Sequence, residues 1–207
     1  MKIAVLVSGG GTNFQALLDT AAKEGLGGGE IVLCLSSNPD AYALERARRF
    51  GVATETVDRK SYPDRESYTL AVMQTLESYE IDLVVLSGFM CIMGESFCKR
   101  YENRIINVHP ALIPSFCGEG YYGLKVHRAA LDYGVKVTGA TVHFVTAETD
   151  GGPIILQRAV AIEQNDTPET LQARVMEQAE WQILPAAVRL FCEGKLTVEG
   201  RKVIIKE

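Results

Sequence analysis

The stretch Lys2-Ile3-Ala4-Val5-Leu6-Val7-Ser8-Gly9-Gly10-Gly11-Thr12-Asn13 decides the fold class of this 207-residue chain. Lys2–Val7 is a short apolar run rich in β-branched residues, which is typical of a strand covered on both faces. After the glycines, apolar residues recur with the spacing of one helix face, so we expect a helix that begins near Thr12 or Asn13. A strand, a glycine turn and a helix in this order indicate an α/β fold.

The same alternation continues through the first half of the chain. Further apolar runs at Ile31–Leu35 and Ile81–Leu86 predict strands, and Ala41–Gly51 and Asp64–Tyr79 have the apolar spacing of helices. Strands separated by helices pair in parallel through right-handed crossovers. The first half is therefore predicted to be a Rossmann-like, doubly wound and mostly parallel sheet.

The pattern changes after residue 100. A strand at Arg104–His109 and a helix at Leu124–Tyr133 are followed by two strands, Val137–Thr146 and Pro153–Ile162. The segment between these strands, Glu148–Pro153, is rich in turn-forming residues, so we expect the two strands to pair antiparallel. The sheet is therefore predicted to be mixed in the C-terminal half.

A long helix and a hairpin are expected at the end of the sequence. Thr167 and Pro168 have the residue types of an N-cap and a first helical position, and the helix pattern continues to about Glu193. We expect Pro185 to kink this helix. Leu196–Ile205, with Glu199-Gly200 at its middle, predicts a terminal β-hairpin.

Length and composition indicate one globular domain over residues 1–207, with 47% apolar and 23% charged residues. No apolar stretch approaches the roughly 18–20 residues that cross a bilayer, and the start of the chain has no signal-peptide pattern, so we expect a cytoplasmic protein without membrane contact. With 21 basic and 26 acidic residues the net charge is −5, which gives no support for nucleic-acid binding. The five cysteines form no C-x-x-C pair, which argues against zinc and a disulfide framework.

The loop Ser8–Asn13 has the composition of an anion site. Its glycines let a ligand approach the backbone, and the free N–H groups at a helix start favour phosphate. Phe14 occupies the last glycine position of a dinucleotide fingerprint, and a Gly-Lys-Ser/Thr sequence is absent, so a single terminal phosphate is the preferred ligand. A tight turn without any ligand remains the alternative.

Asn107 and His109 end a strand at the edge where open α/β sheets bind ligands. Residues i and i+2 point to one face of a strand, so the amide and the imidazole are expected side by side, an arrangement that suits a developing oxyanion. Asp150 lies in the glycine-rich turn, where it is either a plain turn residue or a partner that raises the pKa of His109. His127 and His143 have the positions of packing or hydrogen-bonding histidines, although His143 could lie nearby.

Four sequence motifs follow one another along the chain. They are Ile3–Asn13 (IAVLVSGGGTN), Leu86–Met90 (LSGFM), Ile106–Pro114 (INVHPALIP), and Thr141–Val145 (TVHFV) followed by Asp150–Ile154 (DGGPI). In these motifs, and over essentially its full length, the chain resembles the folate-dependent phosphoribosylglycinamide formyltransferases. That family formylates glycinamide ribonucleotide during purine synthesis, with 10-formyltetrahydrofolate as co-substrate and no metal.

The resemblance implies a role for each matching position. Gly11, Thr12, Asn13 and Glu180 match residues that bind the ribonucleotide. Asn107, His109 and Asp150 match the catalytic triad. The positions that match folate-binding residues are Arg65, Met90, Cys91, Ile92, Met93, Asn107, Thr146, Ala147, Glu148, Thr149 and Asp150. Residues 1–100 would then form the phosphate-binding half, and residues 101–207 the catalytic and folate-binding half.

Two positions depart from the commonest pattern of the family. Cys91 stands where many members carry arginine, but a contact made by the backbone survives that exchange. The segment Phe116–Leu124 is longer than the usual loop before Gly-Leu, which leaves the shape of this flap open.

The mechanism that the resemblance implies is direct transfer. The amine of the ribonucleotide attacks the formyl carbon, Asn107 and protonated His109 stabilise the oxyanion, and Asp150 keeps the imidazole charged.

Three alternative functions stay open: a formyltetrahydrofolate hydrolase, a methionyl-tRNA or sugar formyltransferase, and a nucleotide-binding regulatory module. The sequence indicates no oligomeric state.

Overall fold

A computed structural model describes residues 1–206, and the chain divides into two compact units, Met1–Ile106 and Asn107–Glu207. The boundary falls within strand β5 (Ile105–His109), between Ile106 and Asn107. That the two units act as one domain remains a prediction.

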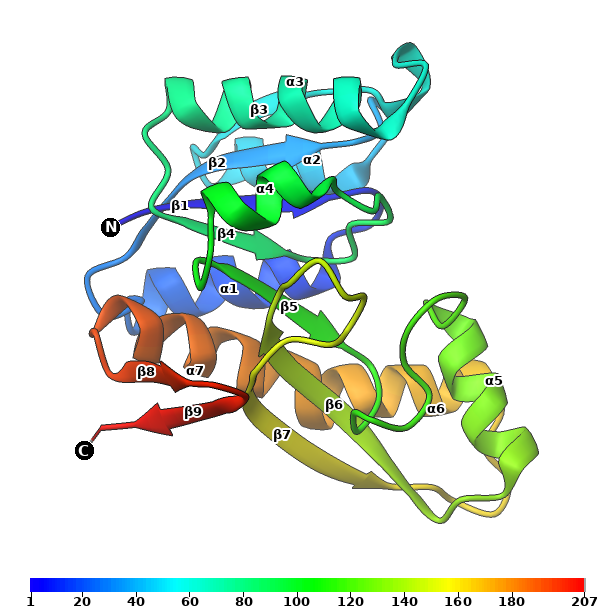
Figure 1. Cartoon of the computed structure of the whole chain (residues 1–207). Helices are drawn as coiled ribbons and strands as arrows, with labels where there is room; N and C mark the ends of the chain where they lie inside the picture. Colours follow the sequence, from blue (N-terminus) through cyan, green and yellow to red (C-terminus); the bar gives the residue numbers. More distant parts are fainter. Residues whose placement is uncertain (207) are drawn as a thin grey trace. The chain divides into compact units, whose positions relative to one another are not determined.

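The first unit contains a parallel sheet (Figure 1). Its strands are β1 (Lys2–Val7), β2 (Glu30–Ser36), β3 (Ala53–Thr56) and β4 (Leu83–Leu86). They lie in the order β3-β2-β1-β4, with β1 paired in parallel to both β2 and β4. The side chains of Ile3 to Val7 are completely buried, which explains why this run is apolar at every position.

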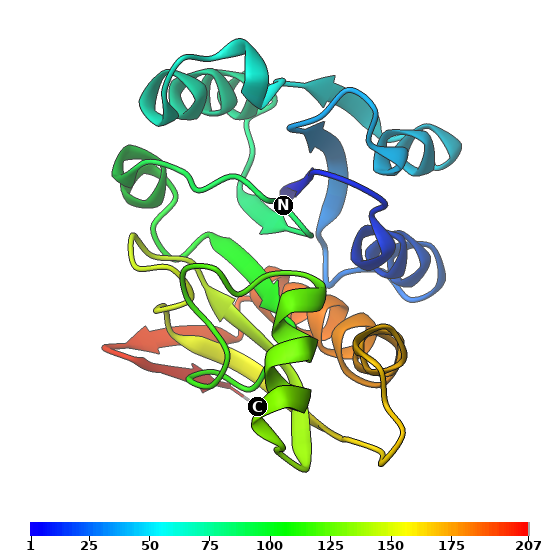
Figure 2. The same ribbon diagram turned by 90° about the vertical axis from the view of Figure 1, so that its right-hand side faces the viewer.

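Helices cover both faces of this sheet. They are α1 (Thr12–Lys23), α2 (Tyr42–Arg49), the 3-10 helix η1 (Arg59–Ser61), α3 (Arg65–Ser78) and α4 (Glu95–Arg100). Figure 2 shows α1 and α2 on one side of the strands and α3 and α4 on the other. Phe14, Leu17 and Leu18 form the buried face of α1. The predicted doubly wound, Rossmann-like arrangement is confirmed.

Three short elements of the first unit were not expected from the sequence: β3, the 3-10 helix η1 and α4. Strand β3 has four residues, none of them buried, so it lacks an apolar run. Helix α4 has six residues, too few for apolar periodicity to be recognised. Strand β4 begins at Leu83, two residues later than expected.

The second unit contains a mixed set of strands. Strand β6 (Val137–Phe144) pairs antiparallel with β7 (Ile154–Ala161), as the turn-rich segment between them predicts. Strands β8 (Leu196–Glu199) and β9 (Lys202–Ile205) form the predicted terminal hairpin. Because β9 meets β7 in parallel at Ile154 and Lys202, the order in this unit is β6-β7-β9-β8.

The second unit has helix α5 (Leu124–Tyr133), helix α6 (Pro168–Val175), the π-helical segment η2 (Met176–Glu180) and helix α7 (Trp181–Cys192). Thr167 and Thr170 form a reciprocal capping box at the start of α6, and Pro168 is its first residue. The expected long helix is divided into α6 and α7 by η2, where the hydrogen-bond register widens. Pro185 lies inside α7, and a kink at this residue stays a prediction. No helix within residues 1–206 is long and apolar enough to cross a membrane.

Candidate functional site

The glycine loop joins β1 to α1 in the first unit. Gly11 is the N-cap residue of α1 and has a left-handed φ of 69°, a conformation that favours glycine. A Cβ at this position would lie 2.6 Å from the Cβ of Ala43 on α2, so the loop and α2 pack closely. Thr12 and Asn13 open the helix, which places Gly11, Thr12 and Asn13 at its positive end.

The segment Met90–Met93 follows β4 in the same unit. The backbone N–H of Met90 donates to Ser8 Oγ at 2.9 Å, which ties this segment to the end of β1. The side chains of Met90 and Ile92 are each 57% exposed and offer apolar surface to a ligand.

Arg65 is the exposed first residue of α3. The Thr69 hydroxyl donates to the Arg65 carbonyl at 2.7 Å and accepts from the Gly94 N–H at 2.9 Å. The first turn of α3 is therefore joined to the chain that follows Met93. The sequence-predicted residues Arg65 and Met90–Met93 lie on connected segments.

Asn107, His109 and Asp150 are brought together with His143 in the second unit. His109 Nδ1 lies 3.5 Å from Asp150 Oδ2, and His143 Nε2 lies 3.6 Å from Asp150 Oδ1. Asn107 Nδ2 is 3.2 Å from His143 Nε2. We call these four residues the His109 cluster.

The turn Thr146–Asp150 and the glycines that follow it place the carboxylate in this cluster. Asp150 has a left-handed φ of 55°, which Asp tolerates better than most residues. A Cβ at Gly152 would collide with the Phe144 carbonyl, so only glycine permits the turn to return this closely to the end of β6. Thr146 stabilises the turn through a hydrogen bond from its hydroxyl to the Glu148 carbonyl at 3.3 Å.

His143 is the cluster residue that sequence reasoning did not assign to the site. Its Nδ1 lies 2.8 Å from the Phe144 carbonyl and donates to it, so in the neutral imidazole Nε2 is the acceptor for the Asn107 amide. His143 thus fixes how the Asn107 amide is turned. Its place at the end of β6, directly before the Asp150 turn, was the available sequence signal.

The titration of His109 differs from the expectation. Burial lowers the pKa of His109 and outweighs Asp150 and the Phe116 carbonyl, both of which raise it. Asp150 raises the pKa of His109 as predicted, but the net direction is downwards because the residue is only 4% exposed. Burial would also raise the pKa of Asp150, but His143, His109 and the Gly118 N–H together hold it below its usual value.

The long loop before α5 covers the cluster. His109 Nε2 donates to the Phe116 carbonyl at 2.8 Å, and the Gly118 N–H donates to Asp150 Oδ2 at 2.8 Å. Phe116 has a left-handed φ of 50°, and its ring packs edge-on against Tyr121 and Tyr133 at 6.4 and 5.9 Å between centroids. The loop backbone is thus hydrogen-bonded to both His109 and Asp150.

Glu180 and His127 are two further buried residues of the second unit. Glu180 is buried at the end of η2, a segment that packs against β6 and β7. His127 is buried on α5 with no hydrogen-bond partner for either ring nitrogen, and burial lowers its pKa to about 4. His127 is therefore a neutral packing residue at ordinary pH.

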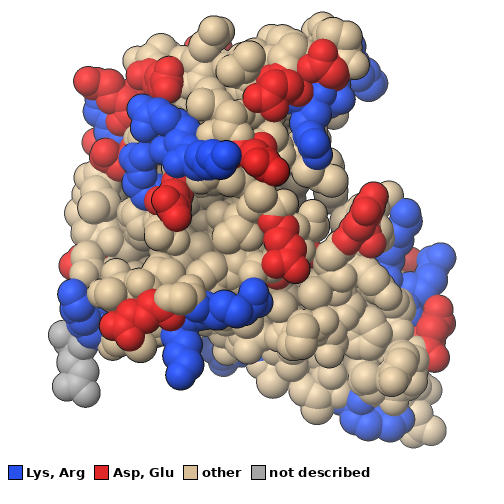
Figure 3. All heavy atoms as spheres, viewed as in Figure 1, with Lys and Arg blue, Asp and Glu red and all other residues tan. Residues whose placement is uncertain are grey.

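The described residues give no alternative metal site. Residues 1–206 contain no group of three or more His, Cys, Asp or Glu side chains placed to hold a metal ion. On the face shown in Figure 3, Lys and Arg are interspersed with Asp and Glu.

Comparisons with known proteins show which family the chain matches. The formyl transferase family model matches residues 1–188. The chain is 41% identical over 196 residues to phosphoribosylglycinamide formyltransferase of Escherichia coli, covering 95% of this chain and 89% of that protein. It is 42% identical over 207 residues to the trifunctional purine biosynthetic protein adenosine-3 of Gallus gallus, of which it spans only 20%.

Solved structures give the same result. The glycinamide ribonucleotide transformylase 1 of Symbiobacterium toebii matches with a TM-score of 0.93 and 46% identity, covering 100% of this chain and 94% of that one. The enzyme of Anaplasma phagocytophilum matches with a TM-score of 0.89 and 34% identity, covering 100% and 95% of the two chains. The resemblance found in the sequence motifs is thus confirmed, and the chain is an enzyme of the one-carbon transferase class. It belongs to the formyl transferase family and, within that family, to the phosphoribosylglycinamide formyltransferases.

Proposed function

We propose that this chain transfers a formyl group from 10-formyltetrahydrofolate to the amine of glycinamide ribonucleotide. The observation that carries the proposal is the His109 cluster, in which a carboxylate, an imidazole and an oriented amide converge in a member of this family. The cluster has the groups needed to move one proton and to stabilise one oxyanion. It requires neither a covalent nucleophile nor a metal ion.

The proposed substrate-binding residues are those that match the family's binding positions. Gly11, Thr12 and Asn13 bind the phosphate of the ribonucleotide through backbone N–H groups at the start of α1, and buried Glu180 binds another part of the same substrate. The folate is bound by Arg65, by Met90, Cys91, Ile92 and Met93, by Asn107, and by Thr146, Ala147, Glu148, Thr149 and Asp150. The exposed apolar side chains of Met90 and Ile92 support this assignment.

The pKa of His109 changes the expected order of proton transfers. Because burial lowers this pKa, the imidazole is largely neutral near pH 7 and accepts a proton from the attacking amine. A new C–N bond forms at the formyl carbon while Asn107 donates to the oxygen that becomes negative. Cleavage of the bond to N10 follows, and the proton passes from His109 to N10, which balances the transfer.

Asp150 and His143 support these two groups. The Asp150 carboxylate beside His109 Nδ1 stabilises the imidazolium that forms during the reaction. His143 accepts from Asn107 and so keeps the other amide hydrogen available for the oxyanion. The Phe116 carbonyl has to leave His109 Nε2 before that nitrogen can serve the substrate.

The remaining expectations are part of the same proposal. We infer that residues 1–207 work as one domain in the cytoplasm, without nucleic acid, membrane or metal. The partners are the two small-molecule substrates.

An assay of 10-formyltetrahydrofolate consumption, with and without glycinamide ribonucleotide, tests the proposed reaction. We expect turnover only when both substrates are present, with one formylated ribonucleotide formed for each tetrahydrofolate released. Turnover without the amine would instead indicate a hydrolase. Binding without turnover would indicate a nucleotide-binding module and contradict the proposal.

A further inference from the structure

Two carbonyl groups of the glycine loop are held by α2. The Gly9 carbonyl accepts from the backbone N–H of Ala43 at 3.1 Å, and the Gly10 carbonyl accepts from Arg46 Nε at 2.8 Å. The first bond is made by backbone alone, whereas the second depends on one side chain. Arg46 also donates from Nη1 to Gln15 Oε1 at 2.8 Å, which joins the loop to the first turn of α1.

These bonds determine where the loop N–H groups point. The C=O of a trans peptide and the N–H that follows it point in opposite directions. Anchoring the carbonyls of Gly9 and Gly10 on α2 therefore turns the N–H groups of Gly10 and Gly11 away from that helix. Within residues 1–206, neither N–H donates to another protein group, so both are available to an anion.

The charge of Arg46 is not neutralised by a carboxylate of the described chain. Its partners are the Gly10 carbonyl, the Gln15 amide and the ring of Tyr42, whose centroid lies 5.0 Å from the guanidinium carbon. The neighbouring arginines of α2 differ, because Arg48 and Arg49 pair with Glu45 at 3.7 and 3.2 Å. The helix thus directs one unpaired positive charge towards the glycine loop.

We propose that Arg46 is a positioning residue for the phosphate of the ribonucleotide. It holds the Gly10 peptide in the orientation that presents the Gly11 N–H, and its charge adds to the positive potential of the α1 terminus. This inference rests on the proposed role of the glycine loop in phosphate binding. Arg46 acts through the Gly10 peptide and its charge, without touching the substrate.

A comparison of the ribonucleotide with its dephosphorylated form, glycinamide riboside, tests the assignment. We expect Arg46→Gln to lower kcat/KM for the ribonucleotide by about 10–100-fold, mainly through KM, since a charge-assisted hydrogen bond and its field are lost. The same variant should leave kcat/KM for the riboside and KM for the folate within about twofold of the original chain. Arg46→Lys, which keeps the charge but not the planar fork, should recover part of the loss.

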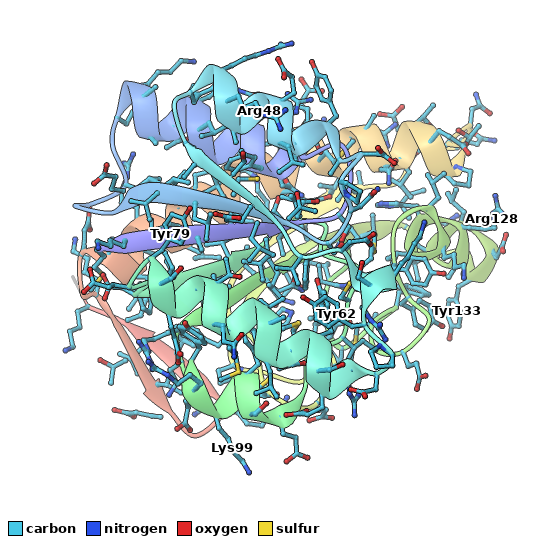
Figure 4. The ribbon with its side chains drawn as sticks, turned by 90° about the horizontal axis from the view of Figure 1, so that it is seen from above. Arg48, Tyr62, Tyr79, Lys99, Arg128 and Tyr133 are labelled. Carbon is cyan, nitrogen blue, oxygen red and sulfur yellow. The ribbon has the colours of Figure 1, made fainter. Side chains whose placement is uncertain are left out.

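The matched control is Arg48→Gln, which removes the same charge from the same helix at a side chain that is 60% exposed (Figure 4). We expect Arg48→Gln to leave kcat/KM unchanged for both the ribonucleotide and the riboside. An Arg46→Gln variant that loses activity equally on both substrates, or that behaves like Arg48→Gln, overturns the assignment while the loop retains its proposed role. If the unsubstituted chain uses both substrates equally well, the phosphate role of the loop fails, and the role of Arg46 fails with it.

Discussion

The glycine loop and the His109 cluster are built in opposite ways. The loop is one continuous stretch that offers backbone N–H groups. Its glycines carry no Cβ, and at Gly11 a Cβ would collide with Ala43. The cluster gathers side chains from β5, from the end of β6 and from the Asp150 turn. Substitutions in the loop are therefore expected to weaken binding of one substrate, whereas substitutions in the cluster are expected to slow the chemical step.

Asp150→Asn should produce the largest effect. The amide cannot stabilise the imidazolium of His109, so we expect kcat to fall by about 10²–10⁴-fold while both KM values stay nearly unchanged. Steady-state kinetics measure both quantities. Asp132→Asn, at an exposed position of α5, is the matched control and should leave both unchanged. Near-normal turnover of Asp150→Asn would remove the carboxylate from the mechanism.

His143→Leu should have the next largest effect. The Asn107 amide loses the acceptor that fixes its orientation, so we expect kcat to fall by about 10–100-fold with little change in KM. His127→Leu is the control, because that buried histidine has no hydrogen-bond partner to lose. Equal losses in the two variants, measured alongside thermal unfolding, would show that His143 acts only through packing.

Gly11→Ala tests the backbone-built site. The new Cβ would lie 2.6 Å from Ala43 Cβ and would impose a left-handed conformation on a residue other than glycine, so we expect a loss of stability of about 1–2 kcal/mol. Because the N–H groups shift with the loop, KM for the ribonucleotide should rise about tenfold while KM for the folate is unchanged. A fall in kcat without a change in KM would contradict the contrast between the two sites.

The pH dependence of kcat/KM should show the smallest change in rate. His109 must be neutral to accept the proton, so kcat/KM should fall as the pH drops through its lowered pKa, with a midpoint below the ordinary value of about 6.5. In Asp150→Asn the midpoint should move lower still, because the carboxylate raises the pKa of His109. A midpoint above 7 in the original chain would show that Asp150 outweighs burial after all.

Long apolar runs made most of the fold predictable from the sequence. Strand β1 is buried along Ile3–Val7, so its pattern is unambiguous, and the same holds for the buried face of α1. Strand β3 is exposed, and only pairing with β2 makes it a strand. The π-helical turn η2 does not disturb the apolar spacing enough to be recognised in sequence.

The site was predictable only in part, for a related reason. Asn107, His109 and Asp150 stand in distinctive local contexts, whereas His143 is a buried strand residue, and only the turn that follows β6 separates it from a packing histidine. The pKa of His109 depends on how deeply the folded chain buries the imidazole, which no local motif encodes. Residue types and spacing therefore suggest which groups react, while burial sets their protonation.

The central claim is that His109 and Asp150 act as one unit on the transferred formyl group. The most direct measurement is the single-turnover rate of formyl transfer in His109→Asn, Asp150→Asn and the double variant, all at saturating substrates. If the pair acts together, the double variant will be about as slow as His109→Asn alone, because the carboxylate has no imidazolium left to stabilise. A double variant whose loss equals the product of the two single losses would contradict the account.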